Sequence, residues 1–232
     1  MVKYIQAIKA LDIVRVQEFL EKDPKWIGWS EPTGKNALHY LCGIPNSGDE
    51  KESSLKILKV LLKFGMDINS VHRIDDKNCI FPATPLWYAY TKGRNERLYK
   101  YLLNQGANPD NCWWAMSWYD DVAAGKLWLK HRARIDKIDQ LFVGTFGWKR
   151  YRFAKWLLTL GADVNAEDEK GNTALMFAVK RKDEENIRSL LRLGADCRKE
   201  NEKNMSAKKL ADSIGPKRIA ALFSESSLEI KE

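Results

Sequence analysis

Apolar residues along the chain come in short helical segments that end in one recurring phrase. The phrase has paired apolar residues, then a turn residue, and then a polar stretch. Its copies are LLKFGMDIN from Leu61, LLNQGANPD from Leu102, WLKHRARID from Trp128, LLTLGADVN from Leu157 and LLRLGADCR from Leu190. Self-similarity of this kind predicts a repeat architecture, in which each unit buries its apolar face against its neighbours.

The turn position of this phrase is occupied by glycine in every copy except the middle one. A helix that stops there needs a residue in the left-handed region, which glycine adopts without steric cost. The glycines are Gly65, Gly106, Gly161 and Gly194, and Arg132 stands in the middle copy. We therefore expect a helix end at each place and a poorer cap at Arg132.

A second phrase precedes the first in most copies. It reads NALHYLC from Asn36, TPLWYAY from Thr84, QLFVGTF from Gln140 and TALMFAV from Thr173. These segments resemble the T-P-L-H-x-A signature of ankyrin repeats, and Leu157 and Leu190 are separated by about the 33 residues of one ankyrin unit. Tetratricopeptide arrays lack this ending, and HEAT or armadillo units are longer. The chain is therefore similar to the ankyrin-repeat family.

The resemblance implies an all-α repeat solenoid of antiparallel helix pairs joined by β-turn fingers, with an irregular central repeat. A finger is the extended loop before the first helix of a pair. In this family the side chains at Asn36, Thr84, Thr173 and Ser206 cap first helices, and His39 braces the adjoining turns. The implied single domain covers 1–226, with a cap over 1–30, repeats over 31–71, 72–112, 113–138, 139–167 and 168–200, a C-terminal cap over 201–226 and a disordered tail over 227–232.

Three departures from the regular unit are expected to carry specificity, because binding in such arrays lies in what is inserted or varied. The segment 44–52 is an insertion rich in turn formers and is predicted to be an exposed loop. The finger over 72–83 is lengthened and ends in an apolar stretch with Phe81, which either docks a partner or folds back over its own unit. The finger before the repeat 113–138 has almost no room and is predicted to be missing.

The shortened region also holds many aromatic residues. The repeat frame places Trp113, Trp128, Phe142, Phe153 and Trp156 in the core. It places Trp118, Tyr119 and Trp148 at the ends of first helices, which in ankyrin arrays face the concave binding surface. Large exposed aromatics are common anchors of interfaces. The alternative is that these rings fill the space that the missing finger leaves.

Polar and basic residues are expected to flank these aromatics. They are Thr91 and Lys92 before the cluster, Lys149 and Arg150 beside Trp148, and Lys180 and Arg181 after it. An aromatic strip with basic flanks suits an acidic protein segment, since the rings supply desolvated contact and the cations fix the register. The alternative for each cation is an ordinary solvated face.

Composition and charge narrow the class without naming a partner. The net charge of +8 is compatible with nucleic acid, an anionic lipid surface or an acidic protein. No apolar run approaches the roughly 18 residues of a membrane span, and Met1 to Val16 lack the core of a signal peptide. The scattered cysteines indicate reduced thiols. We expect a cytoplasmic monomer that does not bind membranes.

Catalytic and cofactor motifs are absent from the sequence. There is no metal-binding H-E-x-x-H, nucleophile G-x-S-x-G or phosphate-binding G-x-x-x-x-G-K-S/T segment. The sequence therefore favours a non-enzymatic module that binds a partner protein on its concave face, without cofactor or metal, as a scaffold, inhibitor or immunity-type protein. The alternative is nucleic-acid or nucleotide binding on a basic, aromatic surface. An enzyme with an unfamiliar site is a third hypothesis.

Overall fold

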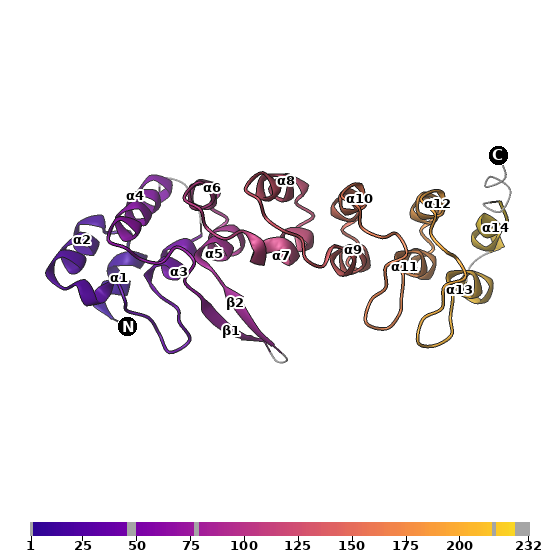
Figure 1. The fold of residues 1–232 in the computed structure, drawn as a ribbon, viewed down its shortest axis with the longest axis horizontal. Coiled ribbons are helices and arrows are strands. Elements are labelled where there is room, and N and C mark those ends of the chain that lie inside the picture. Colours follow the sequence, from indigo (N-terminus) through magenta and orange to yellow (C-terminus); the bar gives the residue numbers. More distant parts are fainter. Residues whose placement is uncertain (1, 46–49, 77–78, 215–216, 226–232) are drawn as a thin grey trace. The chain divides into compact units, whose positions relative to one another are not determined.

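The computed structural model describes residues 2–45, 50–76, 79–214 and 217–225 (Figure 1). Over these residues the chain forms helix pairs joined by loops and one β-hairpin. The contacts divide it into two compact units, Met1–Cys112 with Lys126–Arg134 and Trp113–Gly125 with Ile135–Glu232. The division passes through helix α8, Val122–Lys130, so the two ends of this helix belong to different units.

The first unit holds three helix pairs and the hairpin. Its helices are α1 Lys3–Lys9, α2 Ile13–Lys22, α3 Ala37–Cys42, α4 Glu50–Lys63, α5 Pro85–Thr91 and α6 Glu96–Asn104, with 3-10 turns η1 Pro24–Trp26 and η2 Asp110–Cys112. The strands β1 His72–Asp76 and β2 Cys79–Ala83 pair antiparallel, from His72 opposite Ala83 to Asp76 opposite Cys79.

The second unit begins with α7 Trp113–Trp118 and the first turn of α8. It continues with α9 Ile138–Gly147, α10 Tyr151–Thr159, α11 Ala174–Arg181, α12 Glu184–Arg192, α13 Ala207–Ile214 and α14 Lys217–Glu225. The last two helices confirm the helix pair predicted between Ser206 and Phe223.

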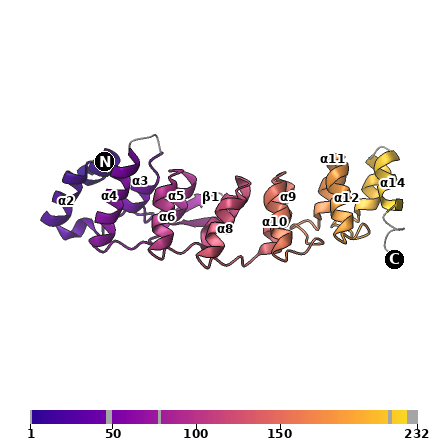
Figure 2. The same ribbon diagram turned by 90° about the horizontal axis from the view of Figure 1, so that it is seen from above.

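Within each unit the helices lie in two layers (Figure 1, Figure 2). In the first unit α1, α3 and α5 contact one another in order, and so do α2, α4 and α6. In the second unit α7, α9, α11 and α13 form the same kind of row. The core lies between the layers, where the leucines of the repeated phrase are buried, namely Leu61, Leu102, Leu157 and Leu190. The expected repeat solenoid of helix pairs is confirmed.

Polar side chains begin the first helices, as predicted. Asn36 accepts hydrogen bonds from the backbone N–H groups of Leu38 and His39, and the Thr84 and Thr173 hydroxyls accept from Trp87 and Met176. Ser206 caps α13 in the same way. Each cap satisfies a backbone donor that the helix itself leaves without a partner.

Left-handed residues end the second helices. Gly65, Gly106, Gly161 and Gly194 all have positive φ, between 84° and 96°, and Arg132 has φ of 62° at the same position. The chain therefore turns at Arg132 as it does at the glycines. The cap at this position differs in that its left-handed residue carries a side chain.

The fingers are regular only near the two ends of the chain. Bridges between Ser30 and Asn36, Glu167 and Thr173, and Glu200 and Ser206 close three of them, and the β-hairpin is the lengthened finger. The fully described segments 105–112 and 131–137 contain no such bridge. The missing finger before α7 is confirmed, but the prediction of a single gap was wrong. Segment 131–137 is also too short for a hairpin and runs directly into α9.

Two further expectations concern the insertion and the tail. Helix α4 begins at Glu50, so the prediction of a loop throughout 44–52 was wrong for its last residues. These residues join the helix because it continues into the apolar periodicity that packs against α3 and α6. Residues 46–49 and the predicted tail 227–232 lie outside the described residues.

Exchanging the turn residues of two copies tests the strain at Arg132. Arg132→Gly should raise the free energy of unfolding by about 0.5–1 kcal/mol, because the left-handed conformation disfavours a side chain. The matched reverse change, Gly161→Arg, should lower it by about 1 kcal/mol. Nothing lies within 4 Å of a β-carbon built at Gly161, so only the backbone is tested. Urea unfolding of the full chain measures both, and a loss of stability in Arg132→Gly would contradict this explanation.

His39 predicts a dependence of stability on pH. Its buried ring accepts the Asn36 N–H at Nδ1 and donates from Nε2 to the Ala83 carbonyl, at 3.2 Å each. Burial lowers the pKa of His39 to about 4, whereas an unfolded histidine titrates near 6.5. The unfolded chain therefore binds the proton first, and stability should fall as pH drops from about 6.5 towards 4, by up to about 1.4 kcal/mol per pH unit. The slope should be smaller in His39→Gln, and an equal slope would refute this assignment.

Candidate functional site

The first helices of successive pairs end in a left-handed residue that is not glycine. Arg94, Asp120, Lys149 and Lys182 have φ between 48° and 63°. Trp118 is the last residue of α7 and Tyr119 follows it, while Trp148 ends α9. Their predicted place at the ends of first helices is thus confirmed. The common turn also shows that Trp148 corresponds to Tyr119 and Arg181, since each directly precedes the left-handed residue.

Three tryptophan side chains meet on the surface of the second unit. The centroid of the Trp148 ring lies 5.3 Å from that of Trp118 and 5.5 Å from that of Trp114, and both pairs are nearly edge to face. Trp118 is 51% exposed, Trp114 46% and Trp148 40%. We call Trp114, Trp118 and Trp148 the tryptophan cluster. Tyr119 is also exposed, at 40%.

The fold holds the tryptophan cluster outward. On α7, Trp113 and Met116 are buried, and Trp113 packs on Trp156, so the face that carries Trp114 is turned away from the core. Gly144 on α9 makes room for the Trp114 ring, because a β-carbon there would lie 2.9 Å from Trp114 Cζ3. The exposure of these rings therefore follows from packing within the unit.

Trp114 was missed at the level of sequence. It stands four residues before Trp118, a spacing that places both on one face of a helix, and this spacing could have identified it. The predicted core residues Trp113, Trp128, Phe142 and Phe153 are buried, whereas Trp156 is only partly buried.

The cations beside the cluster have different roles. Arg181 donates to the carbonyl of Phe146 at 2.9 Å and to that of Gly147, so its guanidinium closes the end of α9. Lys180 is exposed and donates to Asn172 Oδ1 at 3.0 Å. Lys149 is the left-handed residue after Trp148 and is exposed.

Arg150, which follows Lys149, was expected beside Trp148 as one of the basic residues that flank the aromatics. Its guanidinium carbon lies 5.3 Å from the centroid of the Trp118 ring. The sequence gives no signal for this contact, because the two residues come from different helix pairs.

The predicted residues of the first unit gather around Trp87. The Phe81 ring lies 5.2 Å from Trp87, and the Lys92 ammonium lies 5.9 Å from it. Thr91 donates its hydroxyl to the Trp87 carbonyl at 2.7 Å. Phe81 thus packs back on its own unit, as one of the two alternatives for the lengthened finger expected. The candidate residues form two groups, one in each unit.

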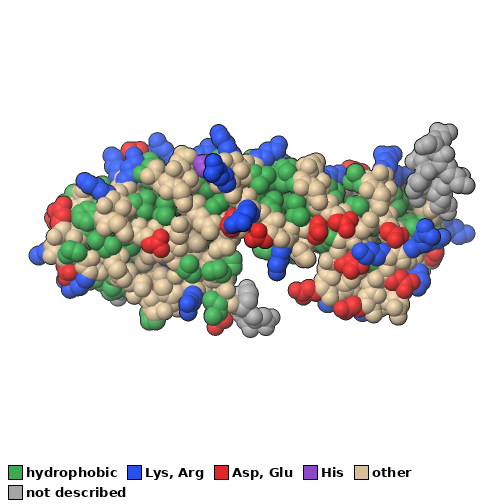
Figure 3. Space-filling view, viewed as in Figure 1, with side chains coloured by type: hydrophobic (Ala, Val, Ile, Leu, Met, Phe, Trp, Pro, Cys, Tyr) green, Lys and Arg blue, Asp and Glu red, His purple; other side chains and the backbone are tan. Residues whose placement is uncertain are grey.

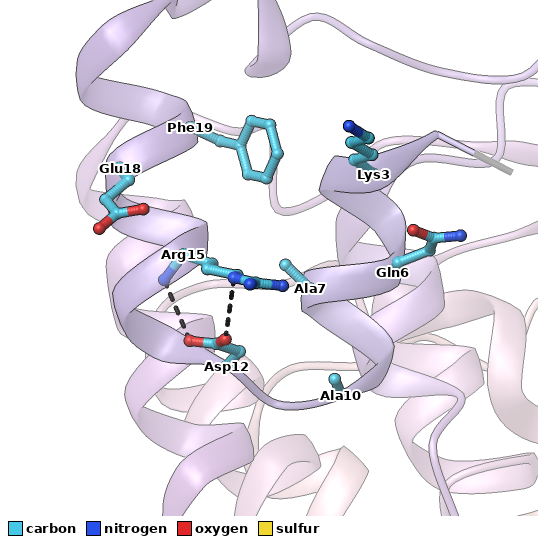
Figure 4. Close-up of a pocket in the computed structure, with 8 residues that line it drawn as sticks. All are labelled: Lys3, Gln6, Ala7, Ala10, Asp12, Arg15, Glu18 and Phe19. Atoms are coloured by element: carbon cyan, nitrogen blue, oxygen red, sulfur yellow. Dashed lines mark hydrogen bonds and ion pairs between the residues drawn. The ribbon is translucent and has the colours of Figure 1, made fainter.

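A separate hollow lies between α1 and α2 and is lined by Lys3, Gln6, Ala7, Ala10, Asp12, Arg15, Glu18 and Phe19. Figure 4 shows the Phe19 ring pointing into the space between the helices, while Gln6 and Glu18 point to either side of it. Arg15 and Asp12 pair with each other. Polar groups therefore do not converge on a common point, as a small-molecule site would require.

The described part of the chain holds neither a cluster of metal-ligand residues nor a helix that could span a membrane. Within it, no group of three histidine, cysteine, aspartate or glutamate side chains could hold a metal ion. No described helix combines the length and apolar character that crossing a membrane requires.

Comparison with known proteins agrees with the geometry. The family model described as "Ankyrin repeat" matches residues 170–202. The crystal structure of the human ASB11 ankyrin repeat domain has a TM-score of 0.67 with this chain, at 19% identity, over 97% of this chain and 98% of that one. Residues 170–202 therefore match an ankyrin repeat, and the chain as a whole has the ankyrin-repeat fold. Among curated proteins, none matches it. Ankyrin repeats are generally protein–protein interaction modules, and the fold is typically non-enzymatic.

Removing the Arg181 guanidinium tests its structural role in the ankyrin repeat. Arg181→Gln should lower the free energy of unfolding by about 1–2 kcal/mol, because two carbonyls at the end of α9 lose a charged donor. Lys180→Gln removes an equal charge from the neighbouring residue and should change stability by less than about 0.5 kcal/mol. Equal effects in chemical denaturation would show that charge, and not the contact with α9, matters.

Proposed function

We propose that this ankyrin-repeat protein binds a partner protein through the tryptophan cluster. The observation that carries the proposal is the exposure of three neighbouring tryptophan rings, between 40% and 51% each. Contiguous exposed apolar surface is uncommon on monomeric proteins and marks interaction sites. Tryptophan is also among the residue types that most often dominate binding energy.

The packing of the cluster favours an interface over a role as filler. A ring that filled the place of a missing finger would be covered by its neighbours, whereas each ring of the cluster keeps a large part of its surface open. The rings also brace one another edge to face, so little side-chain freedom remains to be lost on binding. Such pre-organised aromatic surface is well suited to anchoring a partner.

The partner surface is proposed to be acidic where it meets the cluster. Lys149 and Lys180 are exposed, and Arg150 lies against Trp118. Complementary charge would steer the encounter and fix the register of the complex. Trp118, Tyr119, Trp148, Lys149, Arg150 and Lys180 therefore remain proposed contacts, and Trp114 joins them. Thr91, Lys92 and Phe81 are proposed as a further contact region of the first unit.

Nucleic acid is the weaker candidate. The Trp118 face is already covered by Arg150, and the other rings meet edge to face, so few open parallel faces are offered to bases. Asp120 and Asp121 directly follow Tyr119. These two carboxylates would repel a polyanion. Figure 3 shows acidic and basic side chains interspersed around the fingers of the second unit, so this face is not uniformly basic.

The proposed role is therefore that of a non-enzymatic scaffold, inhibitor or immunity-type protein, which acts by occupying a surface of its partner. The cytoplasmic location, the monomeric state and the concave position of the site remain predictions. A protein interface anchored by aromatics should weaken only modestly with salt, whereas nucleic-acid binding should fall steeply.

Truncating the cluster tests the proposal. The variant Trp114→Ala, Trp118→Ala, Trp148→Ala should bind a partner captured from the native host at least about 100-fold more weakly by calorimetry, since interface anchors contribute 2 kcal/mol or more each. Leu193→Ala removes an exposed apolar side chain of the second unit outside the cluster and should bind normally. A folded triple variant that retains every partner would rule out this site.

A further inference from the structure

Arg150 is held in place by the backbone at the junction of α9 and α10. The backbone N–H of Arg150 donates to the Thr145 carbonyl at 3.1 Å, and the preceding residue, Lys149, has a left-handed backbone conformation. The guanidinium lies over the Trp118 ring, with its carbon 5.3 Å from the ring centroid. The side chain is only partly exposed. Arg150 therefore presents a cation in a fixed position at the edge of the tryptophan cluster.

The guanidinium has no acceptor within the described chain. Its Nε is fully enclosed and without a hydrogen-bond partner. No hydrogen bond joins the terminal nitrogens to a described residue. The carboxylate of Asp120, in the turn after α7, accepts the Phe153 N–H at 2.7 Å through Oδ1. Arg150 differs in this respect from Arg181, whose guanidinium donates to the backbone carbonyls of Phe146 and Gly147.

A guanidinium that lacks an acceptor, such as that of Arg150, is well placed to bind a planar anion. A partly buried donor without an acceptor costs free energy, and a partner that supplies the acceptor recovers it. Arginine presents its terminal N–H groups as a rigid fork that matches the two oxygens of a carboxylate. Stacking on Trp118 keeps the fork oriented and limits the entropy lost on binding.

We propose that Arg150 is the specificity-determining residue of the binding surface and receives the side-chain carboxylate of an Asp or Glu in the partner. The apolar residues next to that carboxylate pack on Trp118 and Trp148. This inference rests on the proposed function, because the carboxylate must arrive with a segment that covers the tryptophan cluster. A nucleic-acid strand is disfavoured because it carries a charge at every nucleotide and would meet Asp120 and Asp121, which directly follow Tyr119, whereas the proposed ligand is a single carboxylate.

A peptide selection tests the inference without a known partner. Random peptides displayed on phage are selected on the full chain and counter-selected on the Trp114→Ala, Trp118→Ala, Trp148→Ala variant. Enriched sequences are synthesised with amidated C-termini, so that only side chains supply carboxylates. They should share an Asp or Glu near apolar residues.

Three variants then test whether binding requires the planar guanidinium of Arg150 or only a positive charge. Arg150→Gln should weaken binding of such a peptide by about tenfold or more, and Arg150→Lys should restore only part of it. Arg152→Gln makes the same substitution at an exposed residue of α10 outside the proposed contacts and should cost less than about threefold. Replacing the peptide's Asp by Asn, or Glu by Gln, should weaken binding to the wild type but not further to Arg150→Gln.

The outcomes distinguish this inference from the proposed function. Peptides that depend on the tryptophan cluster but lack a carboxylate, or that bind Arg150→Gln unchanged, would overturn the role of Arg150 and leave the proposed function standing. The absence of any cluster-dependent peptide would overturn both. Tight binding of a thymidine oligonucleotide that competes with the peptides would show that Arg150 receives a phosphate instead.

Discussion

The fold depends on one constraint, which is that each helix pair can bury its apolar face only against the next pair. Leu61, Leu102, Leu157 and Leu190 are buried at equivalent places because successive pairs stack in this way. The left-handed turns and polar caps follow from it, since each helix must stop where the next pair begins. Polar side chains cap the first helices, and the finger loops link one pair to the next wherever the chain is long enough to form them.

The tryptophan cluster lies where this regular arrangement is interrupted. Two successive connections, 105–112 and 131–137, have no finger, and α7 and α9 follow directly after them. Trp114 on α7 then rests on Gly144 of α9, and Trp118 meets Trp148. The rings on α7 and α9 thus brace one another, and Arg150 lies beside them.

Much of this could be predicted from the sequence because the repeated phrases fix helix positions and turns. The caps, the glycine turns, the buried leucines and the exposure of Trp118 and Trp148 all follow from position within a repeat. Contacts between repeats could not be predicted in the same way. The use of Arg181 at the end of α9 and the stacking of Arg150 on Trp118 depend on how pairs dock. The second missing finger was overlooked because QLFVGTF resembles a regular first helix, although α9 begins at Ile138.

The central claim is that the tryptophan cluster is the surface that a partner covers. Fluorine NMR of the chain labelled with 5-fluorotryptophan tests it directly, since each of the nine tryptophans gives its own signal. On addition of the partner protein, the signals of Trp114, Trp118 and Trp148 should shift or broaden, while that of the buried Trp128 should not. If the three signals of the cluster remain unchanged in a saturated complex, the partner binds elsewhere and the account is contradicted.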